Sequence, residues 1–393
     1  MSHVVNKEEP FLPFSRPTFD DQEIQEVVDC LKSGWITTGP RVQKFENDLK
    51  DYLNSQHVLS LASATAGLYM ALMALDLKPG DEVITTSFTF VATLNVIVLA
   101  GGKPILVDID PKTYNIDVGL IEQAITPRTR AILPVHFAGL SVDLDPIYNL
   151  AKKHNLRVIE DAAQAIGTQY KHKMIGGFGD MQVFSFHPNK NMTTIEGGAL
   201  SLQTDDLLNR LSCGRFHGID RAIWNRFSKQ GSQHYDVLEP ALKFNMPDVH
   251  AGLGIYQLKK LENFIKIRTK LANRYVSILS GWDELYLPEN PTSYSHKHSW
   301  HLFAPCLNIE RVGFSRDDLV QKMKDLGIGL GLHYDPPYLY QYYQETFGFK
   351  RGDFPHTEWV SERIFSLPLF PLMTEKDQDR VIAALSLIFG KTT

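Results

Sequence analysis

The sequence predicts an α/β fold built on a mostly parallel sheet covered by helices, followed by a smaller α+β domain. Short apolar runs bounded by Gly, Pro or Asp recur between residues 57 and 202. Several of these runs are separated by segments with helical spacing, and from about residue 250 the pattern changes to one long helical stretch. Strands that are apolar on both faces and alternate with helices are typical of a parallel sheet buried between helices.

The first predicted element is a helix over residues 20–33. Its apolar residues follow helical spacing, an Asp precedes them, and Gly34 follows the last turn. The strands of the sheet are predicted at HVLSLAS, DEVITTS, KPILVDID, AILPVHF, RVIEDAA, MQVFSF and GALSL. The helices between them are predicted at TAGLYMALMAL, FVATLNVIVLA and DLDPIYNLAKKHN.

The C-terminal third has a different pattern. It begins with a long helical stretch, AGLGIYQLKKLENFIKIRTKLANRYVSILSGW, and continues with a strand at WHLFAPCLNI, a helix at SRDDLVQKMKDLG and a closing helix from Glu375. We therefore expect a large domain over residues 1–250, with an N-terminal arm over 1–33, and a small domain over 251–393.

Composition narrows the class of protein. The 393 residues carry a formal net charge of −5, and Lys and Arg are scattered, so no nucleic-acid partner is expected. The three cysteines have neither metal-binding nor disulfide spacing, which fits a reducing cytoplasm. The N-terminus does not resemble a signal peptide, and the most apolar stretch, TLNVIVLAGG, is too short to span a bilayer. We expect a cytoplasmic protein without a metal site or a membrane partner.

One lysine stands out in the stretch FSFHPNKNMTTIEGGALS, residues 184–201. Most lysines are solvated surface charges. Lys190, however, lies in a polar loop between two apolar strands and precedes the pair Gly197-Gly198, where the backbone can turn sharply or approach a neighbour closely. A lysine held in such a place can lose its proton and form a Schiff base with a carbonyl compound.

One such carbonyl compound is pyridoxal phosphate, and a protein site that binds it needs two further features. A carboxylate must face the pyridine nitrogen, and Asp161 and its neighbour Glu160 both end an apolar strand, where ligands collect in open α/β sheets. The strand pattern does not decide between these two acids, whose side chains point to opposite faces. A phosphate cradle is also needed, and the small residues of LASATAGLYMAL open a helix whose free N–H groups favour an anion.

Each of these features also has an ordinary interpretation. Asp161 could cap a helix, and the SATAG segment could be a simple helix start. Their order along the chain is more specific than any one of them: a strand–helix junction of small residues, then an acid at a strand end, then a lysine before a glycine pair.

At this point the chain resembles the DegT/DnrJ/EryC1/StrS family of pyridoxal-phosphate sugar aminotransferases over nearly its whole length. The similar stretches are FLPFSRP, SGWITTGP, SATAG, GDEVIT, ITPRT, PVHFAG, IEDAAQAIGT, FSFHPNKNMTTIEGGAL, FHGI, KFNMPD, SWHLF, GIGLGLHY and SLPLFPLMT. SGWITTGP, SATAG and SLPLFP are most similar to the ArnB-type branch, which aminates a UDP-linked 4-keto pentose. The resemblance implies the fold type I architecture, a homodimer with sites shared between subunits, and L-glutamate as amino donor, with 2-oxoglutarate as its product.

The resemblance also implies roles for individual residues. Lys190 matches the lysine that binds the cofactor covalently, and Asp161 matches the partner of the pyridine nitrogen. Contacts to the ring and the phosphate are implied for Phe90, Gln164, Ala64, Thr65, Ser185 and, from the partner subunit, Asn245. Contacts to the substrate are expected from Trp35, Thr37, His187, Arg226, His333 and Tyr334. Without the resemblance, Phe90 reads as core packing and Asn245 as a turn residue, and a structural role for His187 stays open.

The chain departs from the ArnB-type pattern after GLHY, where it reads Asp335-Pro336-Pro337-Tyr338. The family uses this loop to bind the sugar nucleotide, so 4-keto-6-deoxy and N-acetylated sugars linked to UDP, dTDP or GDP stay open as substrates, for lipid A, O-antigen or another surface glycan. Lys190 argues against the family's dehydratase branch, in which histidine takes its place. A non-catalytic sugar-nucleotide sensor or scaffold of the same fold is the alternative function. A nicotinamide-dependent oxidoreductase would need a GxGxxG segment after the first strand, which is absent.

Overall fold

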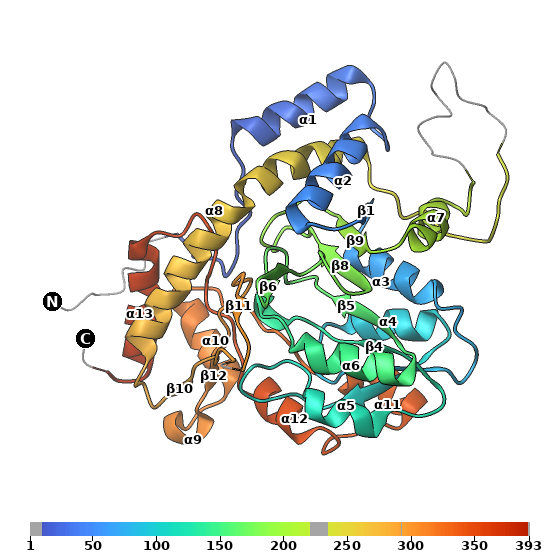
Figure 1. Cartoon of the computed structure of the whole chain (residues 1–393). Coiled ribbons are helices and arrows are strands. Elements are labelled where there is room, and N and C mark those ends of the chain that lie inside the picture. Colours follow the sequence, from blue (N-terminus) through green and yellow to red (C-terminus); the bar gives the residue numbers. More distant parts are fainter. Residues whose placement is uncertain (1–9, 221–234, 292, 392–393) are drawn as a thin grey trace.

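A seven-stranded sheet lies at the centre of the computed structural model, which describes residues 10–220, 235–291 and 293–391 (Figure 1). In spatial order its strands are β1 (His57–Leu61), β9 (Gly198–Leu202), β8 (Met181–Ser185), β5 (Arg157–Asp161), β4 (Thr129–Leu133), β2 (Glu82–Thr86) and β3 (Lys103–Val107).

The strand directions confirm the mostly parallel sheet. Strands β8, β5, β4, β2 and β3 run parallel to one another. Only β9 runs antiparallel to its two neighbours, β1 and β8, within this sheet. The carboxyl ends of β5 and β8 therefore meet at one edge of the sheet, and the chain between β8 and β9, residues 186–197, turns back over that edge.

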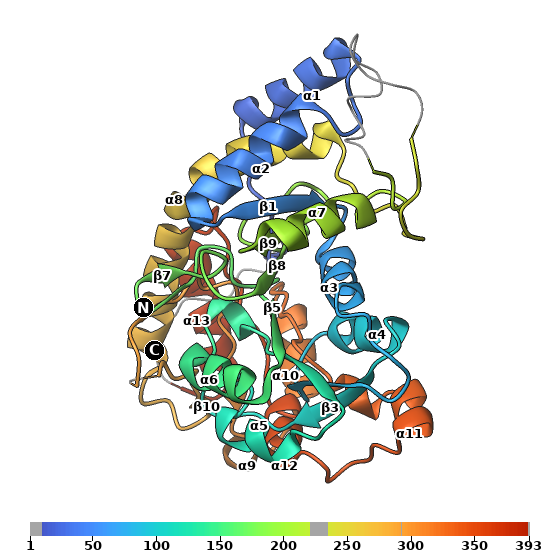
Figure 2. The ribbon, with the colours of Figure 1, turned by 45° about the vertical axis from the view of Figure 1, so that its right-hand side comes forward.

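Helices cover both faces of the sheet, as Figure 2 shows. One face carries α3 (Ala64–Met73) and α4 (Val91–Leu99), and the other carries α5 (Val118–Ala124) and α6 (Leu144–His154). The side chains of successive residues of β8 point to opposite faces of the sheet, because side chains alternate along a strand. Val183 belongs to the cluster with Leu68 of α3, whereas Phe184 belongs to a cluster on the other face. Burying each such side chain contributes roughly 1.5–3 kcal/mol.

The N-terminal arm is helical where the sequence predicts it. Helix α1 (Asp21–Ser33) begins with a capping box of Asp20 and Glu23, and it ends at Gly34, whose φ of 72° suits a residue without a Cβ. Helix α2 (Pro40–Leu53) follows, with Pro40 in its first turn. Both helices pack on α8 (Asp248–Leu279), which has 32 residues and is about 48 Å long.

Helix α8 joins two hydrophobic clusters. Its first half packs with β8 and α2, and its second half packs with the C-terminal segments. Arg268 is buried in this second half and donates to the carbonyl oxygens of Trp300, His301 and Leu369. The domain division near residue 250 stays a prediction.

The remaining segments are short. The helices are α7 (Asp205–Gly214), α9 (Ile309–Val312), α10 (Arg316–Asp325), α11 (Gln341–Phe347), α12 (Pro355–Ser361) and α13 (Glu375–Ile388), with 3₁₀ turns η1 (Phe137–Gly139) and η3 (Pro337–Leu339). The strands are β6 (Gln169–Tyr170), β7 (Lys173–Met174), β10 (Leu285–Tyr286), β11 (His296–Lys297) and β12 (Cys306–Leu307).

One predicted element is wrong for most of its length. Of the expected strand over residues 300–309, only Cys306–Leu307 forms a strand. Pro305 has no N–H to donate to a ladder, and Trp300 has a φ of +48°, so neither position can continue a regular strand. The helices predicted at SRDDLVQKMKDLG and from Glu375 are confirmed as α10 and α13. In the described ranges, every helix is too short or too polar to cross a membrane.

Candidate active site

A cavity of about 530 Å³ opens at the sheet edge where β5 and β8 end. It brings together residues that the sequence analysis selected from distant parts of the chain. These are Ala64, Thr65, Phe90, Asp161, Gln164, Ser185, His187, Lys190, His333 and Tyr334. The meeting of strand ends, a helix start and a loop at one edge is the usual place for a ligand in an open α/β sheet.

Lys190 lies in the loop between β8 and β9, and its N–H donates to the carbonyl oxygen of His187 at 2.9 Å. Burial lowers the pKa of Lys190 to about 8, and the nearby carboxylate of Asp161 opposes this shift. Because the ammonium form is poorly solvated here, an appreciable fraction of the side chain is the free amine near neutral pH. Lys190 can therefore act as a nucleophile and as a base.

Asp161 ends β5 and is the acid that faces the cavity, whereas Glu160 does not line it. Thr93 Oγ1 donates to Asp161 Oδ2 at 2.9 Å, and the N–H of Ala163 donates to Oδ1 at 3.1 Å. Burial raises the pKa of Asp161, because a buried carboxylate is poorly solvated, and the hydrogen bonds from Ala163 and Thr93 and the charge of Lys190 only partly oppose this shift. A cationic ligand atom placed in the cavity would supply the missing charge.

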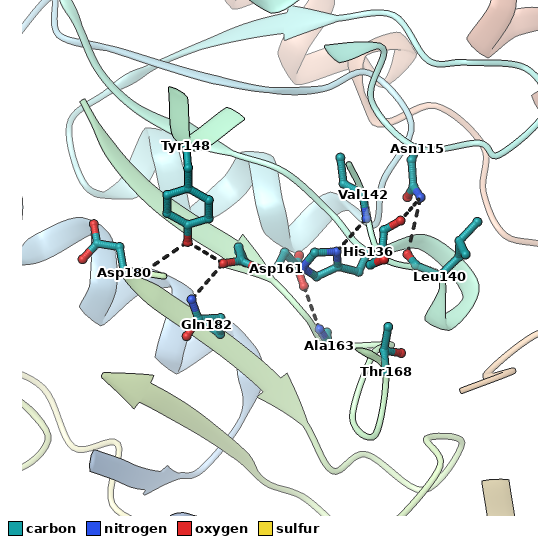
Figure 3. Close-up of polar contacts among 12 residues, drawn as sticks. Asn115, His136, Leu140, Val142, Tyr148, Asp161, Ala163, Thr168, Asp180 and Gln182 are labelled. Carbon is teal, nitrogen blue, oxygen red and sulfur yellow. Dashed lines mark hydrogen bonds and ion pairs between the residues drawn. The ribbon is translucent and has the colours of Figure 1, made fainter. Parts of the chain in front are cut away.

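Glu160 is buried in a polar network with His136, Tyr148 and Gln182. Figure 3 labels these three partners. Its Oε1 accepts from Tyr148 Oη at 2.6 Å and from Gln182 Nε2 at 2.8 Å. Its Oε2 pairs with His136 Nε2 at 2.8 Å. These three contacts occupy most of the acceptor positions of the Glu160 carboxylate, so its role is structural and little of it is available to a ligand.

His136 connects this network to the cavity. Its Nδ1 accepts the N–H of Val142 at 3.1 Å, so its Nε2 carries the proton and donates to Glu160. Its own backbone N–H donates to the carbonyl oxygen of Asp161 at 3.0 Å. Glu160 therefore holds the segment 136–142, which runs beside Asp161.

We expect Glu160→Gln to lower the free energy of unfolding by about 2 kcal/mol or more, because an amide cannot accept from all three buried donors. Tyr148→Phe is the comparison: it leaves the carboxylate with two donors and also removes the acceptor of the Asp180 N–H, so a loss of about 1–2 kcal/mol is expected. Urea titrations of the two variants and the wild type measure the difference. A smaller loss for Glu160→Gln than for Tyr148→Phe would contradict this account of the network.

The N-terminus of α3 forms an anion cradle in the cavity wall. The Ser63 side chain accepts from the N–H of Ala66 at 3.1 Å, and the N–H groups of Ala64 and Thr65 begin the helix without an intrahelical acceptor. Gly198 makes this arrangement possible, because a Cβ there would lie 2.6 Å from the nitrogen of Ala64. The glycine after the lysine loop therefore lets β9 approach the cradle.

Two flat side chains line the same cavity as Asp161. Phe90, just before α4, lines the cavity with 56% of its surface exposed. Gln164 Oε1 accepts the N–H of Ala138 at 2.6 Å, and its Nε2 donates to Tyr334 Oη at 2.5 Å. Both hydrogen bonds fix the plane of the Gln164 amide, which suits it to lie against an aromatic ring.

Three selected residues do not line this cavity. Trp35, Thr37 and Asn245 lie together where α2 and α8 begin. Trp35 Nε1 donates to the carbonyl oxygen of Thr38, and Asn245 Nδ2 donates to Thr38 Oγ1 at 2.6 Å. The buried Oδ1 of Asn245 has no hydrogen-bond partner in the described part of the chain. Arg226 lies outside the described residues. The roles assigned to these four residues stay predictions.

Several residues that line the cavity were not selected from the sequence, namely Thr93, Asn189, Glu196 and Tyr340 among others, whereas Asp335 was named as part of the loop after GLHY. Thr93 had a usable signal, because a hydroxyl in the otherwise apolar first turn of α4 has to find a buried acceptor. Tyr340 had none, because its position depends on how the C-terminal segments fold back over the sheet.

The cavity fits pyridoxal phosphate. The amine of Lys190 would bind its aldehyde, the carboxylate of Asp161 would face its ring nitrogen, and the start of α3 would offer N–H groups to its phosphate. Phe90 and Gln164 both line this cavity, and a flat side chain of either kind can pack against a ring.

Comparison with known proteins agrees with this geometry. The model of the DegT/DnrJ/EryC1/StrS aminotransferase family matches residues 17–386. The chain is 46% identical over 384 residues to the protein MJ1066 of Methanocaldococcus jannaschii, covering 98% of this chain and 99% of that protein. It is 41% identical over 386 residues to the spore coat polysaccharide biosynthesis protein SpsC of Bacillus subtilis, covering 97% and 98%.

Two solved structures are similar over almost the whole chain. The putative sugar aminotransferase Spr1654 of Streptococcus pneumoniae, in its PMP form, superposes with a TM-score of 0.88 at 31% identity, covering 96% of this chain and 99% of that chain. PseC of Helicobacter pylori, an aminotransferase involved in the biosynthesis of pseudoaminic acid, superposes with a TM-score of 0.89 at 29% identity, covering 97% and 99%. Spr1654 has also been solved in a PLP form.

Proposed function

The chain belongs to the DegT/DnrJ/EryC1/StrS aminotransferase family, and from this premise we propose that it transfers the amino group of L-glutamate to the C4 keto group of a nucleotide-linked sugar. Its cofactor is pyridoxal phosphate, as in its solved neighbours. The observation that carries the proposal is one cavity shared by the partly buried amine of Lys190, the carboxylate of Asp161 and the N-terminus of α3.

Each residue has a defined task in this mechanism. Pyridoxal phosphate supplies an electron sink for the amino-acid carbon when it is bound. Lys190 Nζ takes the proton from the Cα of glutamate and later delivers a proton to C4 of the sugar. Asp161 keeps the ring nitrogen protonated, and the start of α3 holds the phosphate.

The second substrate is proposed to be an activated sugar for a surface polysaccharide. The names of SpsC and PseC support this class, because the first is named for the spore coat polysaccharide and the second for pseudoaminic acid. A UDP-4-keto pentose and a UDP-, dTDP- or GDP-linked 4-keto-6-deoxy sugar are the candidates, and 2-oxoglutarate is the product of the first half-reaction. The cavity residues His187, His333 and Tyr334 are proposed to contact the sugar.

We further propose that two chains share each active site. Trp35, Thr37 and Asn245 lie outside the cavity of their own chain, and the unpartnered Oδ1 of Asn245 is consistent with a contact across the interface. Helix α1 also exposes Ile24 and Leu31, which are apolar side chains two turns apart. Mixing Lys190→Ala with Asn245→Ala under exchange conditions tests this, because only hybrid dimers contain one intact site. No recovery of turnover would reject the shared site.

The function itself is tested by assaying glutamate-dependent amination across these 4-keto sugar nucleotides. We expect ping-pong kinetics with at least one of them, because the amino group resides on the enzyme between half-reactions. The purified protein should be yellow, and glutamate should bleach the colour. A colourless protein that binds sugar nucleotides without converting them would replace the proposal with a sensor or scaffold.

Cofactor capture should depend on pH. Because burial lowers the pKa of Lys190 to about 8, the rate at which cofactor-free protein binds pyridoxal phosphate should rise with pH and level off above about 8. Only the unprotonated amine attacks the aldehyde, and the protonated amine dominates below that pKa. Stopped-flow absorbance at a series of pH values measures this rate. A midpoint near the ordinary lysine pKa of about 10.4 would show that the amine is fully solvated.

A further inference from the structure

Thr38 is a buried residue that the proposed mechanism does not use. Its side chain is only 3% exposed, and it lies in the segment that precedes α2. We propose that Thr38 is a positioning residue, which turns the side-chain amide of Asn245 so that one N–H of Nδ2 is presented to the cofactor phosphate. This role rests on the proposed function, because it explains how Asn245 takes part in the shared active site.

The hydrogen bonds of Thr38 have a fixed direction. Its Oγ1 donates to the carbonyl oxygen of Met246 at 2.7 Å, and a hydroxyl has one proton to donate. The same oxygen therefore accepts from Asn245 Nδ2, which lies 2.6 Å away. Exchanging the amide oxygen and nitrogen of Asn245 would either set two acceptors against each other or leave the carbonyl of Met246 without this donor.

One N–H of the Asn245 amide remains available after this bond. Nδ2 carries two protons, and Thr38 accepts one of them. The amide group is planar, so fixing the direction of the first N–H also fixes that of the second. A phosphate dianion offers only acceptor oxygens, so the second N–H, and not Oδ1, is the group that suits it. Hydrogen bonds to a charged acceptor are stronger than those between neutral groups, which makes the direction of this N–H important.

The backbone around Thr38 is held in place by Asp248, a fully buried residue of α8. Its carboxylate accepts from three N–H groups, those of Gly39, Arg41 and Val42, at 2.8, 3.1 and 3.0 Å. In the other direction, the N–H of Asp248 donates to the carbonyl oxygen of Thr37 at 3.2 Å. These reciprocal bonds join residues 37–42 to the start of α8, so Thr38 is pre-organised beside its partner.

Asn245 is anchored on its other side to the strand that leads into the anion cradle. It pairs with Leu61, the last residue of β1, and the N–H of Ala62 donates to the carbonyl oxygen of Phe244 at 2.7 Å. Ser63, which caps α3, comes next in the chain. The freedom that remains to Asn245 is rotation of its side chain, and the hydrogen bond to Thr38 restricts that rotation.

Binding of pyridoxal phosphate and of pyridoxal to the full-length protein freed of cofactor tests this role, because the two probes differ only by the phosphate. Thr38→Val keeps the shape of the side chain and removes its hydroxyl. We expect it to weaken binding of pyridoxal phosphate about five- to tenfold and to change binding of pyridoxal by about twofold or less, since part of one charged hydrogen bond is lost. Thr38→Ser keeps the hydroxyl and should bind both probes like the wild type. Absorbance titrations measure the dissociation constants.

Further variants separate orientation of the amide from folding. Thr38→Val/Asn245→Ala should bind pyridoxal phosphate no more weakly than Asn245→Ala alone, because Thr38 acts only through Asn245. Thr85→Val is the matched control: Thr85 is also buried, its Oγ1 donates to the carbonyl oxygen of Leu133 at 2.7 Å, and it does not line the cavity. This control should retain the wild-type preference for pyridoxal phosphate. Thr38→Ala, which leaves room for a water molecule, makes the same test should the valine prevent folding.

The proposal is overturned if Thr38→Val weakens both probes equally, if Asn245→Ala binds pyridoxal phosphate like the wild type, if the two single losses add in the double variant, or if Thr85→Val shows the same loss. Its failure is separable from failure of the proposed function, because cofactor binding needs no sugar. A phosphate-selective loss in Thr38→Val without amination of any 4-keto sugar would retain the role of Thr38 and reject the function. Amination of such a sugar, with no phosphate-selective loss in Thr38→Val, would do the reverse.

Discussion

Lys190→Ala should lower aminotransferase turnover by about 10⁴-fold, the upper end of what a positioned acid–base group contributes. The cavity has one lysine among its described lining residues, so no described neighbour can replace its amine. The variant should still bind pyridoxal phosphate through the start of α3 and Asp161, but without the visible band of the covalently bound form. Coupled detection of 2-oxoglutarate and absorbance spectra measure the two effects.

Two comparisons separate chemistry from folding for this variant. Added methylamine should restore part of the activity of Lys190→Ala, because a small amine can enter the space that the side chain leaves. Lys44→Ala should retain wild-type turnover, since Lys44 is exposed and pairs only with Asp48 among the described residues. Full activity of Lys190→Ala without an added amine would refute the assigned role.

Asp161→Asn should reduce kcat/KM by about 10²- to 10³-fold, because a buried ionic partner is worth about 3–5 kcal/mol when it is removed. An amide can keep the hydrogen bond from the N–H of Ala163, but it cannot hold a proton on the ring nitrogen by charge. Weaker cofactor binding and a shifted absorbance spectrum are expected together with slower turnover. Steady-state kinetics and titration with pyridoxal phosphate measure both.

Thr93→Val is the graded comparison for this carboxylate. It preserves side-chain shape, removes the hydrogen bond to Asp161 Oδ2 and leaves the charge in place, so a loss of about tenfold or less is expected. An equal loss in Asp161→Asn and Thr93→Val would mean that orientation of the acid, and not its charge, accounts for the effect.

Much of the cavity could be predicted because its residues sit at positions with local signatures. Lys190 stands before a glycine pair, Asp161 ends an apolar strand, and Thr65 opens a helix of small residues. Each position is fixed by short-range rules of strands and helix starts, and parallel strands then bring their ends to one edge. The strand pattern alone left Asp161 and Glu160 open, since strand alternation does not say which face carries the cavity, and only the resemblance favoured Asp161 before the structure placed it in the lining.

Other features depend on contacts between distant segments. Only the family resemblance, and no local pattern, indicated that residues 333–338 belong to the site, and Tyr340 had no signal at all. The antiparallel direction of β9 was equally inaccessible, because a buried run of apolar residues reads the same in either direction. Helix α2 was missed although Pro40 marks its start, since PRVQKFENDLKDYL is mostly polar and its apolar residues face α8 and β1.

The exposed ring of Phe90 and the buried carboxyl group of Asp161 affect the lifetime of the protein in a cell, because both depend on the bound coenzyme. Without its coenzyme, the chain presents an uncovered aromatic surface and a poorly solvated carboxyl group in one cavity. Because a ligand that binds only the native state stabilises it by mass action, vitamin B6 supply sets the fraction of molecules open to proteases. Cells starved of the vitamin should therefore contain less of this protein at an unchanged rate of synthesis.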